Sequence, residues 1–306
     1  MLSETRKKKL QILTQSLLRG DIDGARKVLE TTAASGAPSA PPTDVPAPDA
    51  GPLDLAAACP GVSTELATPQ GAMKFWMVRR RLAEIAPDCA DVSARYAAVL
   101  RGAGQRLDEL EASVGLCHAA NAAPEDLLFM DIETCGLAGT AIFLVGTMAY
   151  DGTDLVFEQH LARDYSEEPA ILHAFADKCA AASLLVTFNG KSFDMNQIRD
   201  RCAFHGIDSL EDQKLPHLDL LHEARKRWKK SVPNCRLQTL EQFFCRRHRV
   251  GDIPGWAIPE AYHRFVSTAD ARQLRDIVHH NMLDLLTMAE LLCAALTGQV
   301  PPEMTQ

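Results

Sequence analysis

Residues 127–161 read LLFMDIETCGLAGTAIFLVGTMAYDGTDLVFEQHL and decide the fold of the chain. They contain three apolar runs, at 127–132, 142–150 and 155–161, each with the length and composition of a buried strand. Asp151 and Gly152 separate the last two runs and form a dipeptide that favours a tight hairpin turn. The stretch therefore predicts a three-stranded antiparallel meander.

Regular patterns continue toward the C-terminus. A helical pattern covers 166–181, a short apolar run covers 184–188, and a second helical pattern covers about 192–204. A long helix is predicted from about 270 to 296, with one apolar stripe made of Leu274, Ile277, Val278, Leu285, Met288, Leu291 and Leu292. The fold class expected from these elements is α/β, a mixed sheet flanked by helices.

The patterns are weaker toward the N-terminus. Residues 3–31 favour one or two short helices, and 32–54 are rich in Ala, Pro, Ser and Gly, a composition typical of a linker. Some strand character at 61–78 precedes a helical pattern at 92–114. We therefore expect three parts: a helical segment and linker at 1–54, a small subdomain at 55–118, and the main domain at 119–298.

Composition limits the kind of protein this is. The 306 residues are 46% hydrophobic and 24% charged, enough to bury one full-sized core and a smaller appendage. No apolar run approaches the ~20 residues that span a bilayer, and the N-terminus lacks the apolar core of a signal peptide. The nine cysteines include no Cys-x-x-Cys pair and are expected to be reduced thiols. These features predict a soluble, cytoplasmic protein without a membrane partner.

The net charge of -8 conceals a strongly basic segment at 224–249. Nine Lys and Arg residues against one acid, Glu241, give this segment a charge of +8 and leave -16 for the remainder. A local positive field attracts a polyanion even when the whole protein is acidic. The alternative is a solvated helix face. The nine residues are Arg225, Lys226, Arg227, Lys229, Lys230, Arg236, Arg246, Arg247 and Arg249.

Asp131 and Glu133 end the first predicted strand. Residues two apart on a strand project from the same face, so these two carboxylates can share a metal ion. Without a cation, two acids at such close range oppose each other's ionisation. The alternative is a strand end that meets solvent.

Asp194 follows the strand predicted at 184–188. The intervening Asn189 and Gly190 favour a turn, Ser192 is a candidate helix cap, and Asp194 falls in the first helical turn. Asp194 is therefore either a helix-capping residue or a metal ligand. If the strand lies beside the first one, the turn carries Asp194 to Asp131 and Glu133.

Asp284 lies on the long C-terminal helix. At ~100° per residue it is ~20° from Ile277 and Leu291, so it borders the apolar stripe. An ionised carboxylate buried there needs a metal or another cation as a partner. A border aspartate paired with an arginine is the alternative.

The three acidic stretches together resemble the motifs of the DEDD exonucleases of the ribonuclease-H-like superfamily. Those motifs are Asp-x-Glu, a mid-domain Asp, and a final Asp preceded by Tyr or His. The resemblance covers about 125–296 and is closest to the YprB-type bacterial branch. It rests on Asp131-Ile-Glu-Thr-Cys-Gly-Leu, Phe188-Asn-Gly-Lys-Ser-Phe-Asp194, His217-Leu-Asp-Leu-Leu221, Gly251-Asp-Ile-Pro-Gly-Trp256 and His280-Asn-Met-Leu-Asp284.

The resemblance implies a ribonuclease-H-like mixed sheet and a metal-dependent nuclease of DNA or RNA, acting 3'-5' on single-stranded ends. It implies two ions, Mg²⁺ or Mn²⁺, held by Asp131, Glu133, Asp194 and Asp284, and hard cations do prefer carboxylate oxygens. The rival expectation is a ribonuclease-H-like module that binds nucleic acid or protein with little or no chemistry.

Two histidines compete for the role of general base. Members of the family with a catalytic His place it five residues before the last Asp, at His279 here, whereas members with Tyr place that residue four before, at His280 here. If the helix is continuous, His279 lies ~140° from Asp284 and His280 only ~40°, so helical geometry favours His280.

Several further residues have two interpretations. Asn189, Lys191, Arg225 and Arg227 are candidate nucleic-acid contacts, although exposed cations are often simply solvated. Trp228 either stacks on a base or anchors its helix to the core. Asp219 is either an accessory ligand or a helix N-cap, and surface histidines are the expectation for His217 and His222.

Overall fold

The computed structural model describes residues 51–89, 91–107, 111–136, 139–207 and 214–301. The chain divides into two units, Met1–Gly51 and Pro52–Gln306, and the described residues belong almost entirely to the second. The helices predicted at 3–31 and most of the linker predicted at 32–54 lie outside the described residues.

A seven-stranded sheet in the order β1-β2-β5-β4-β3-β6-β7 forms the centre of this unit. Antiparallel pairing of β3 with β4 and of β4 with β5 confirms the predicted meander. Parallel pairing joins β6 to β3 and β7 to β6, which confirms the mixed sheet. The strands are β1 (Val62–Thr68), β2 (Gly71–Arg81), β3 (Leu127–Thr134), β4 (Ile142–Tyr150), β5 (Leu155–Leu161), β6 (Leu184–Thr187) and β7 (His217–Asp219).

The connection between β4 and β5 is longer than the predicted two-residue turn. Tyr150 pairs with Leu155, so four residues form the loop. The side chain of Asp151 accepts hydrogen bonds from the backbone N–H groups of Thr153 and Asp154, which stabilises this wider turn.

The small separate subdomain predicted at 55–118 is not observed, because this segment is part of the main unit. The hairpin of β1 and β2 extends the same sheet, with β2 antiparallel to β5. Helix α5 (Asp91–Gly102) packs on the C-terminal helix α12 (Arg272–Thr297). Local sequence patterns do not report pairing between strands that lie about 80 residues apart, so the prediction divided one domain into two.

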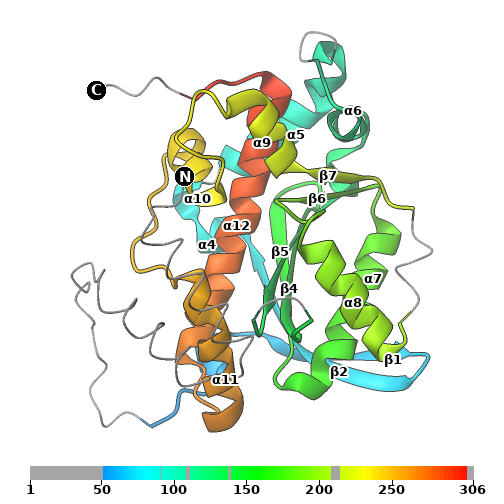
Figure 1. Ribbon diagram of the computed structural model, residues 1–306, viewed down its shortest axis with the longest axis vertical. Helices are drawn as coiled ribbons and strands as arrows, with labels where there is room; N and C mark the ends of the chain where they lie inside the picture. The colour runs from blue at the N-terminus through cyan, green and yellow to red at the C-terminus, as the bar shows by residue number, and fades with distance from the viewer. Residues whose placement is uncertain (1–50, 90, 108–110, 137–138, 208–213, 302–306) are drawn as a thin grey trace, which may run out of the picture. The chain divides into compact units, whose positions relative to one another are not determined.

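Helices cover both faces of the sheet. Figure 1 shows α12 running along one side of the strands, with α7 and α8 on the other side, and α12 and α7 both contact β4. All seven residues of the predicted apolar stripe of α12 are buried. The other helices are α3 (Leu55–Ala58), α4 (Leu82–Ile85), α6 (Val114–Asn121), α7 (Glu168–Ala181), α8 (Asp194–His205), α9 (Leu220–Trp228), α10 (Leu237–Leu240) and α11 (Ile258–Thr268).

Two global features follow from the described residues. Within these ranges no helix combines the length and the apolarity needed to cross a bilayer. All nine cysteines are free thiols, and Cys59, Cys179, Cys202 and Cys293 are buried while the other five are half-buried.

Candidate active site

Asp131 and Glu133 lie near the C-terminal end of β3, on one face of the strand. Asp131 pairs with Gly146 of β4, and the register shifts between Glu133 and Thr134. Ile132, between the two acids, is buried in the core. The alternation of the strand therefore presents both carboxylates side by side, as the sequence predicted.

Asn281 of α12 joins this pair of acids to the helix. Its amide Nδ2 donates to Oδ2 of Asp131 at 2.8 Å, and its Oδ1 accepts from Nε2 of Gln159 at 2.9 Å. Asp131, Gly146 and Gln159 form one row across β3, β4 and β5, so Asn281 sits over the middle of that row.

Gly146 makes this close approach possible. A Cβ at residue 146 would lie only 1.8 Å from Oδ1 of Asn281, so a side chain there would displace the helix. Asn281 stands within a motif of the sequence, but its role was not predicted. A glycine in the middle of an apolar strand was the available signal, because such a residue often marks a close approach by another segment.

Asp284 follows one helical turn after Asn281 and faces the same region. Asp131 and Asp284 line one pocket, although 153 positions separate them. The charge of Asp284 is also among the causes that raise the pKa of Asp131 and of Glu133. The C-terminal helix therefore brings its aspartate to the acids of the first strand.

Asp194 is held at the site by a rigid turn. Asn189 adopts a left-handed conformation (φ 68°), and a Cβ on Gly190 would lie 2.4 Å from Oγ1 of Thr187. Asp219 clamps the turn by accepting the backbone N–H groups of Asn189 and Lys191. α8 begins at Asp194, with Phe193 and not the predicted Ser192 at the N-cap position, because the turn continues one residue further.

The four acids interact strongly. Burial raises the pKa of Asp131 and of Glu133 well above the usual value, and repulsion by the neighbouring carboxylates raises both further. Burial also raises the pKa of Asp194 to about 7, against hydrogen bonds from the backbone of Asp194 and Ile132. Burial raises the pKa of Asp284 too, opposed by the charges of Arg249 and His280.

The chemistry of this donor set fits a divalent cation, since a cation would relieve both the burial of four carboxylates and their mutual repulsion. In the described part of the chain, however, no group of three or more His, Cys, Asp or Glu is arranged so that it could hold a metal ion. Oδ1 of Asp284 instead accepts from Nη2 of Arg249 at 2.5 Å. The four acids are therefore suitable ligands for a divalent ion, but in this structure the cation beside Asp284 is the guanidinium of Arg249.

His280 lies at the site and is oriented by Asp252. Its Nδ1 is 2.9 Å from the Asp252 carboxylate, and its Nε2 is 3.5 Å from Oδ2 of Asp284. His279 is exposed and lines a separate pocket, as the continuous helix predicted. Asp252 also stands within a motif of the sequence, but its role was missed because it depends on a loop that returns to α12.

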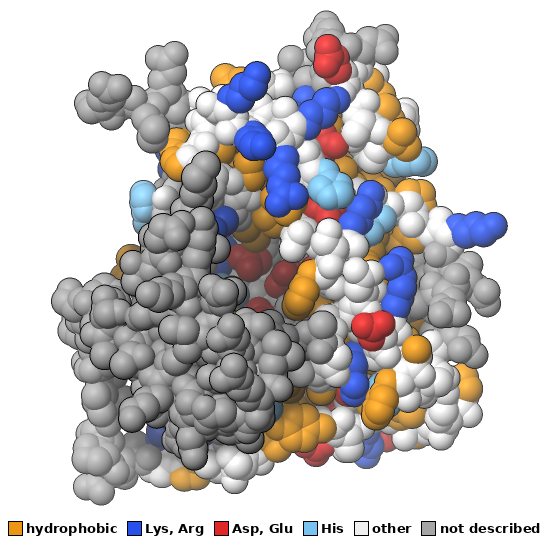
Figure 2. Space-filling view, in the orientation of Figure 1, with side chains coloured by type: hydrophobic (Ala, Val, Ile, Leu, Met, Phe, Trp, Pro, Cys, Tyr) orange, Lys and Arg blue, Asp and Glu red, His pale blue; other side chains and the backbone are white. Residues whose placement is uncertain are grey.

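Basic residues border the pocket that contains Asp131 and Asp284. This pocket has a volume of about 550 Å³, and its lining includes Asn189, Arg225, Asn234 and Arg236. Figure 2 shows Asp and Glu side chains at the bottom of a hollow, with Lys and Arg side chains gathered beside it over α9. Lys191 is exposed in the turn that also carries Asn189.

Arg227 is not part of that lining. Its side chain is 13% exposed, its Nε lies 3.3 Å from Glu223, and it lines a pocket with Trp228 and Gln299. The structure therefore places Asn189 and Arg225 in the pocket with Asp131 and Asp284, leaves Lys191 outside its lining, and turns Arg227 to another pocket.

A second pocket adjoins Glu133 and has aromatic walls. Phe193, at the N-terminus of α8, and Trp256, before α11, line it together with Glu133 and Pro259. Trp256 is 84% exposed and Phe193 is 38% exposed. Large apolar side chains left open to solvent beside a polar site are typical of a binding surface.

The remaining alternatives are decided by contacts. Trp228 anchors its helix, since it is buried, packs on Phe244 and donates from Nε1 to the backbone of Gln299. Asp219 is the N-cap of α9. His222 is exposed as predicted, but His217 is half-buried, with Nε2 2.8 Å from Oγ1 of Thr187, and burial lowers its pKa to about 4.

Comparison with known proteins agrees with this geometry. Residues 128–295 match the sequence profile of the RNase H superfamily. An uncharacterized protein, YprB of Bacillus subtilis (strain 168), is 34% identical over 186 residues, which are 58% of this chain and 44% of YprB. The chain therefore spans less than half the length of that relative.

A solved structure gives a weaker match. The family B DNA polymerase from the hyperthermophilic archaeon Pyrobaculum calidifontis aligns with a TM-score of 0.44 and 15% identity, over 54% of this chain and 24% of the polymerase. The matched profile covers more than half of the residues and includes all four acids. The chain belongs to the RNase H superfamily, in a YprB-type branch.

Proposed function

We propose that this protein is a metal-dependent nuclease that hydrolyses phosphodiester bonds of DNA or RNA, as a 3'-5' exonuclease on single-stranded ends. Two Mg²⁺ or Mn²⁺ ions would be held by Asp131, Glu133, Asp194 and Asp284. The observation that carries the proposal is the meeting of four acids from β3, α8 and α12, with raised pKa values, beside a basic pocket. Membership of a superfamily with a nuclease-like fold supports it.

The protein groups have separate roles in such a reaction. The ions would stabilise negative charge on both sides of the reacting phosphorus. Asn281 holds Asp131 in place, and Asp219 holds the turn that positions Asp194. His280 has its Nδ1 against Asp252, so its Nε2 is the nitrogen that can take a proton from the attacking water.

The surroundings favour a single-stranded nucleic acid. Arg225 and Arg236 provide positive charge for a phosphate backbone on one side of the acids. Phe193 and Trp256 provide stacking surfaces for unpaired bases on the side of Glu133. A paired base does not expose its face, so the aromatic pocket supports the choice of single-stranded ends.

A binding module with weak or no catalysis is the second candidate. The ion pair between Arg249 and Asp284 favours it, because a carboxylate paired with arginine has a structural partner without any metal.

The decisive experiment incubates the purified protein with end-labelled single- and double-stranded DNA and RNA, in Mn²⁺ or in EDTA. We expect Mn²⁺-dependent shortening from the 3' end of single strands. Asp194→Asn should abolish it, whereas Asp200→Asn, an exposed aspartate on the same helix, should leave it unchanged. No cleavage of any substrate by the wild type would support the binding module, and activity in Asp194→Asn would show that another site or a contaminant acts.

A further inference from the structure

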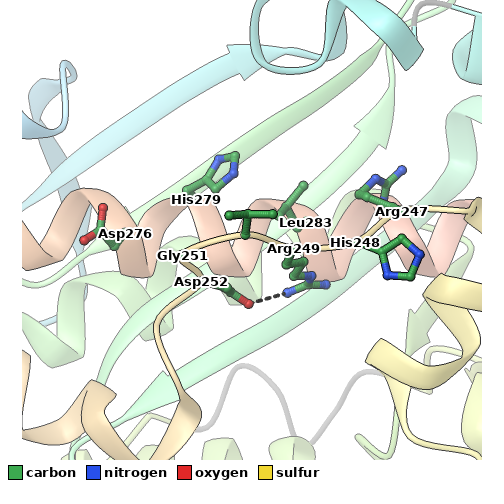
Figure 3. Close-up of a pocket in the computed structure, with 9 residues that line it drawn as sticks. Arg247, His248, Arg249, Gly251, Asp252, Asp276, His279 and Leu283 are labelled. Carbon is green, nitrogen blue, oxygen red and sulfur yellow. Dashed lines mark hydrogen bonds and ion pairs between the residues drawn. The ribbon is translucent and has the colours of Figure 1, made fainter. Parts of the chain in front are cut away.

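The segment 246–252 runs alongside α12 and carries an arginine into the candidate site. It follows the π-helical turn η5 (Glu241–Cys245), and residues with positive φ shape both of its ends, Arg246 (φ 51°) and Gly251 (φ 73°). Figure 3 shows Arg249 and Asp252 of this segment pointing toward one another, with His279 of α12 pointing the other way. The segment and α12 together line a pocket around His279, to which none of the four acids contributes.

Arg249 contacts three carboxylates at once. Its Nε lies 2.7 Å from Glu241, its Nη1 3.3 Å from Asp252, and its Nη2 2.5 Å from Asp284. The side chain is only 6% exposed. Burial opposes its charge, but Asp284 and Glu241 raise its pKa, so Arg249 is a fixed positive charge.

This ion pair limits what Asp284 can do. Oδ1 of Asp284 is occupied by the guanidinium, and Oδ2 faces Nε2 of His280 at 3.5 Å. The Asp284 side chain is 15% exposed, so water can replace little of what these two partners provide. A divalent ion that used Oδ1 of Asp284 would stand where the guanidinium now stands, and like charges exclude each other at that distance.

We propose that Arg249 is a resident cation of the site, which neutralises Asp284 in the metal-free protein and competes with the divalent ion for its Oδ1. The inference rests on the proposed function, because it concerns the metal that the nuclease would use. It makes Arg249 a determinant of metal affinity: metal binding includes the release of one ion pair.

The release is feasible because Arg249 keeps its other partners. Glu241 is 1% exposed and also pairs with Arg247, so it remains a buried carboxylate for Nε of Arg249. Asp252 remains for Nη1. Leaving Asp284 therefore does not strand a buried guanidinium, which would be strongly unfavourable.

Arg247 offers a matched control. It lies two residues away in the same segment and is also largely buried, but its partners are Glu241 and Glu290, which are not among the four acids. Arg249→Met and Arg247→Met each remove one positive charge and one ion pair with Glu241. Only the first frees Asp284.

The test is a calorimetric titration of the full chain with Mn²⁺ alone. We expect Arg249→Met to bind Mn²⁺ about 10- to 100-fold more tightly than the wild type, the range over which outer partners change metal affinity. Arg247→Met should change the affinity by less than about 10-fold, below that range. Equal or weaker binding by folded Arg249→Met would overturn the inference, since removal of a merely structural arginine would weaken the site.

A measurement on the wild type covers the case in which Arg249→Met does not fold. In a ¹⁵N spectrum of arginine side chains, Mg²⁺ should shift or broaden the Arg249 guanidinium signals and leave those of Arg247 in place. Signals of Arg249 that stay unchanged at saturating Mg²⁺ would overturn the inference. Absence of any Mn²⁺ or Mg²⁺ binding to the wild type and to Arg249→Met would instead contradict the proposed function itself.

Discussion

Asn281 donates a hydrogen bond from Nδ2 to Oδ2 of Asp131 at 2.8 Å, and this bond connects the C-terminal helix to the first acid of the site. Gln159 fixes the orientation of the amide by donating to its Oδ1. The amide therefore belongs to the fold and to the candidate active site at the same time.

Asn281→Ala should reduce both the stability of the fold and the activity of the candidate site. We expect about a 10- to 100-fold lower kcat/KM, because Asp131 loses its orienting partner. We also expect a decrease of about 1–3 kcal/mol in the free energy of unfolding, because Gln159 is left buried without this acceptor. Steady-state kinetics and urea denaturation measure the two effects. Asn196→Ala, on the exposed face of α8, is the control that should change neither.

Gly146→Ala should destabilise the protein by about 1–3 kcal/mol, the usual cost of overpacking, since its Cβ would overlap Oδ1 of Asn281. The loss of stability should be smaller in an Asn281→Ala background, because that variant lacks the Oδ1 atom with which the new Cβ would clash. Gly104→Ala is the control, because its nearest neighbour would be the backbone of Ala120 at 3.7 Å. Equal costs of Gly146→Ala in both backgrounds, measured by denaturant unfolding, would show that the close approach of Asn281 is not responsible.

Asp194→Asn should stabilise the metal-free protein. The folded-state pKa of Asp194 is about 7, above its ordinary 3.8. Asp194 therefore adds to the free energy of unfolding at low pH, and this contribution is lost as the pH rises through about 7. The amide of Asn can still accept a backbone hydrogen bond but carries no charge. At pH 8 in EDTA we expect a melting temperature several degrees higher, since 1 kcal/mol shifts it by about 2–4 °C in a chain of this size. An unchanged or lower value in scanning calorimetry would contradict this explanation.

His160 should give the free energy of unfolding a pH dependence of the opposite sign. It lies in β5, is buried against Phe75, and burial followed by the charge of Lys178 lowers its pKa from 6.5 to about 4. The pKa of His160 is lower in the folded than in the unfolded protein. Its contribution to the free energy of unfolding is therefore fully present above pH 6.5 and is lost as the pH falls toward 4.

Urea denaturation at several pH values measures this decrease in stability, which should reach about 3 kcal/mol for this group. His160→Leu should flatten the stability profile over that interval, whereas His222→Gln, at an exposed position, should leave its shape unchanged. Profiles of wild type and His160→Leu that run parallel between pH 4 and 6.5 would show that His160 takes up its proton freely in the folded state.

The pocket lining predicts which arginines bind nucleic acid. Arg225→Ala and Arg236→Ala should each weaken the binding of a labelled single strand and reduce the slope of log K against log salt by about 0.7 for each phosphate that the variant no longer neutralises. Arg227→Ala should have little effect on either, because its guanidinium pairs with Glu223. Fluorescence anisotropy in EDTA over a salt series makes this comparison without cleavage. An effect of Arg227→Ala as large as that of Arg225→Ala would place the nucleic acid along the other face of α9.

The sequence was sufficient to predict the elements whose pattern is local. The apolar runs of 127–161 specify the meander, and the stripe of α12 places Asp284 at the edge of the buried face. The hairpin of β1 and β2 was misjudged because its partner β5 lies far along the chain. Propensity describes a strand but does not say which strand it pairs with.

The same division applies to the site. Asp131, Glu133 and Asp284 could be predicted to point inward from strand and helix periodicity, and Asp194 from the turn that follows its strand, while the grouping of the four came from the family resemblance. Asn281, Asp252 and Arg249 were not, because each acquires its role from a tertiary partner: Gln159, His280 and Asp284 respectively. An arginine in a basic segment looks the same in the sequence whether it faces solvent or three carboxylates.

The lack of a side chain at residue 146 has a consequence for how the fold and the site are inherited. A descendant that lost its acids and kept only a binding role would still need a glycine at 146 for as long as Asn281 packs there. A descendant that replaced the glycine and kept Asn281 would have to shift the helix, and Asp284 with it. The close approach of residues 146 and 281 thus belongs to the architecture, whereas the four acids belong to the proposed reaction, and the first does not depend on the second.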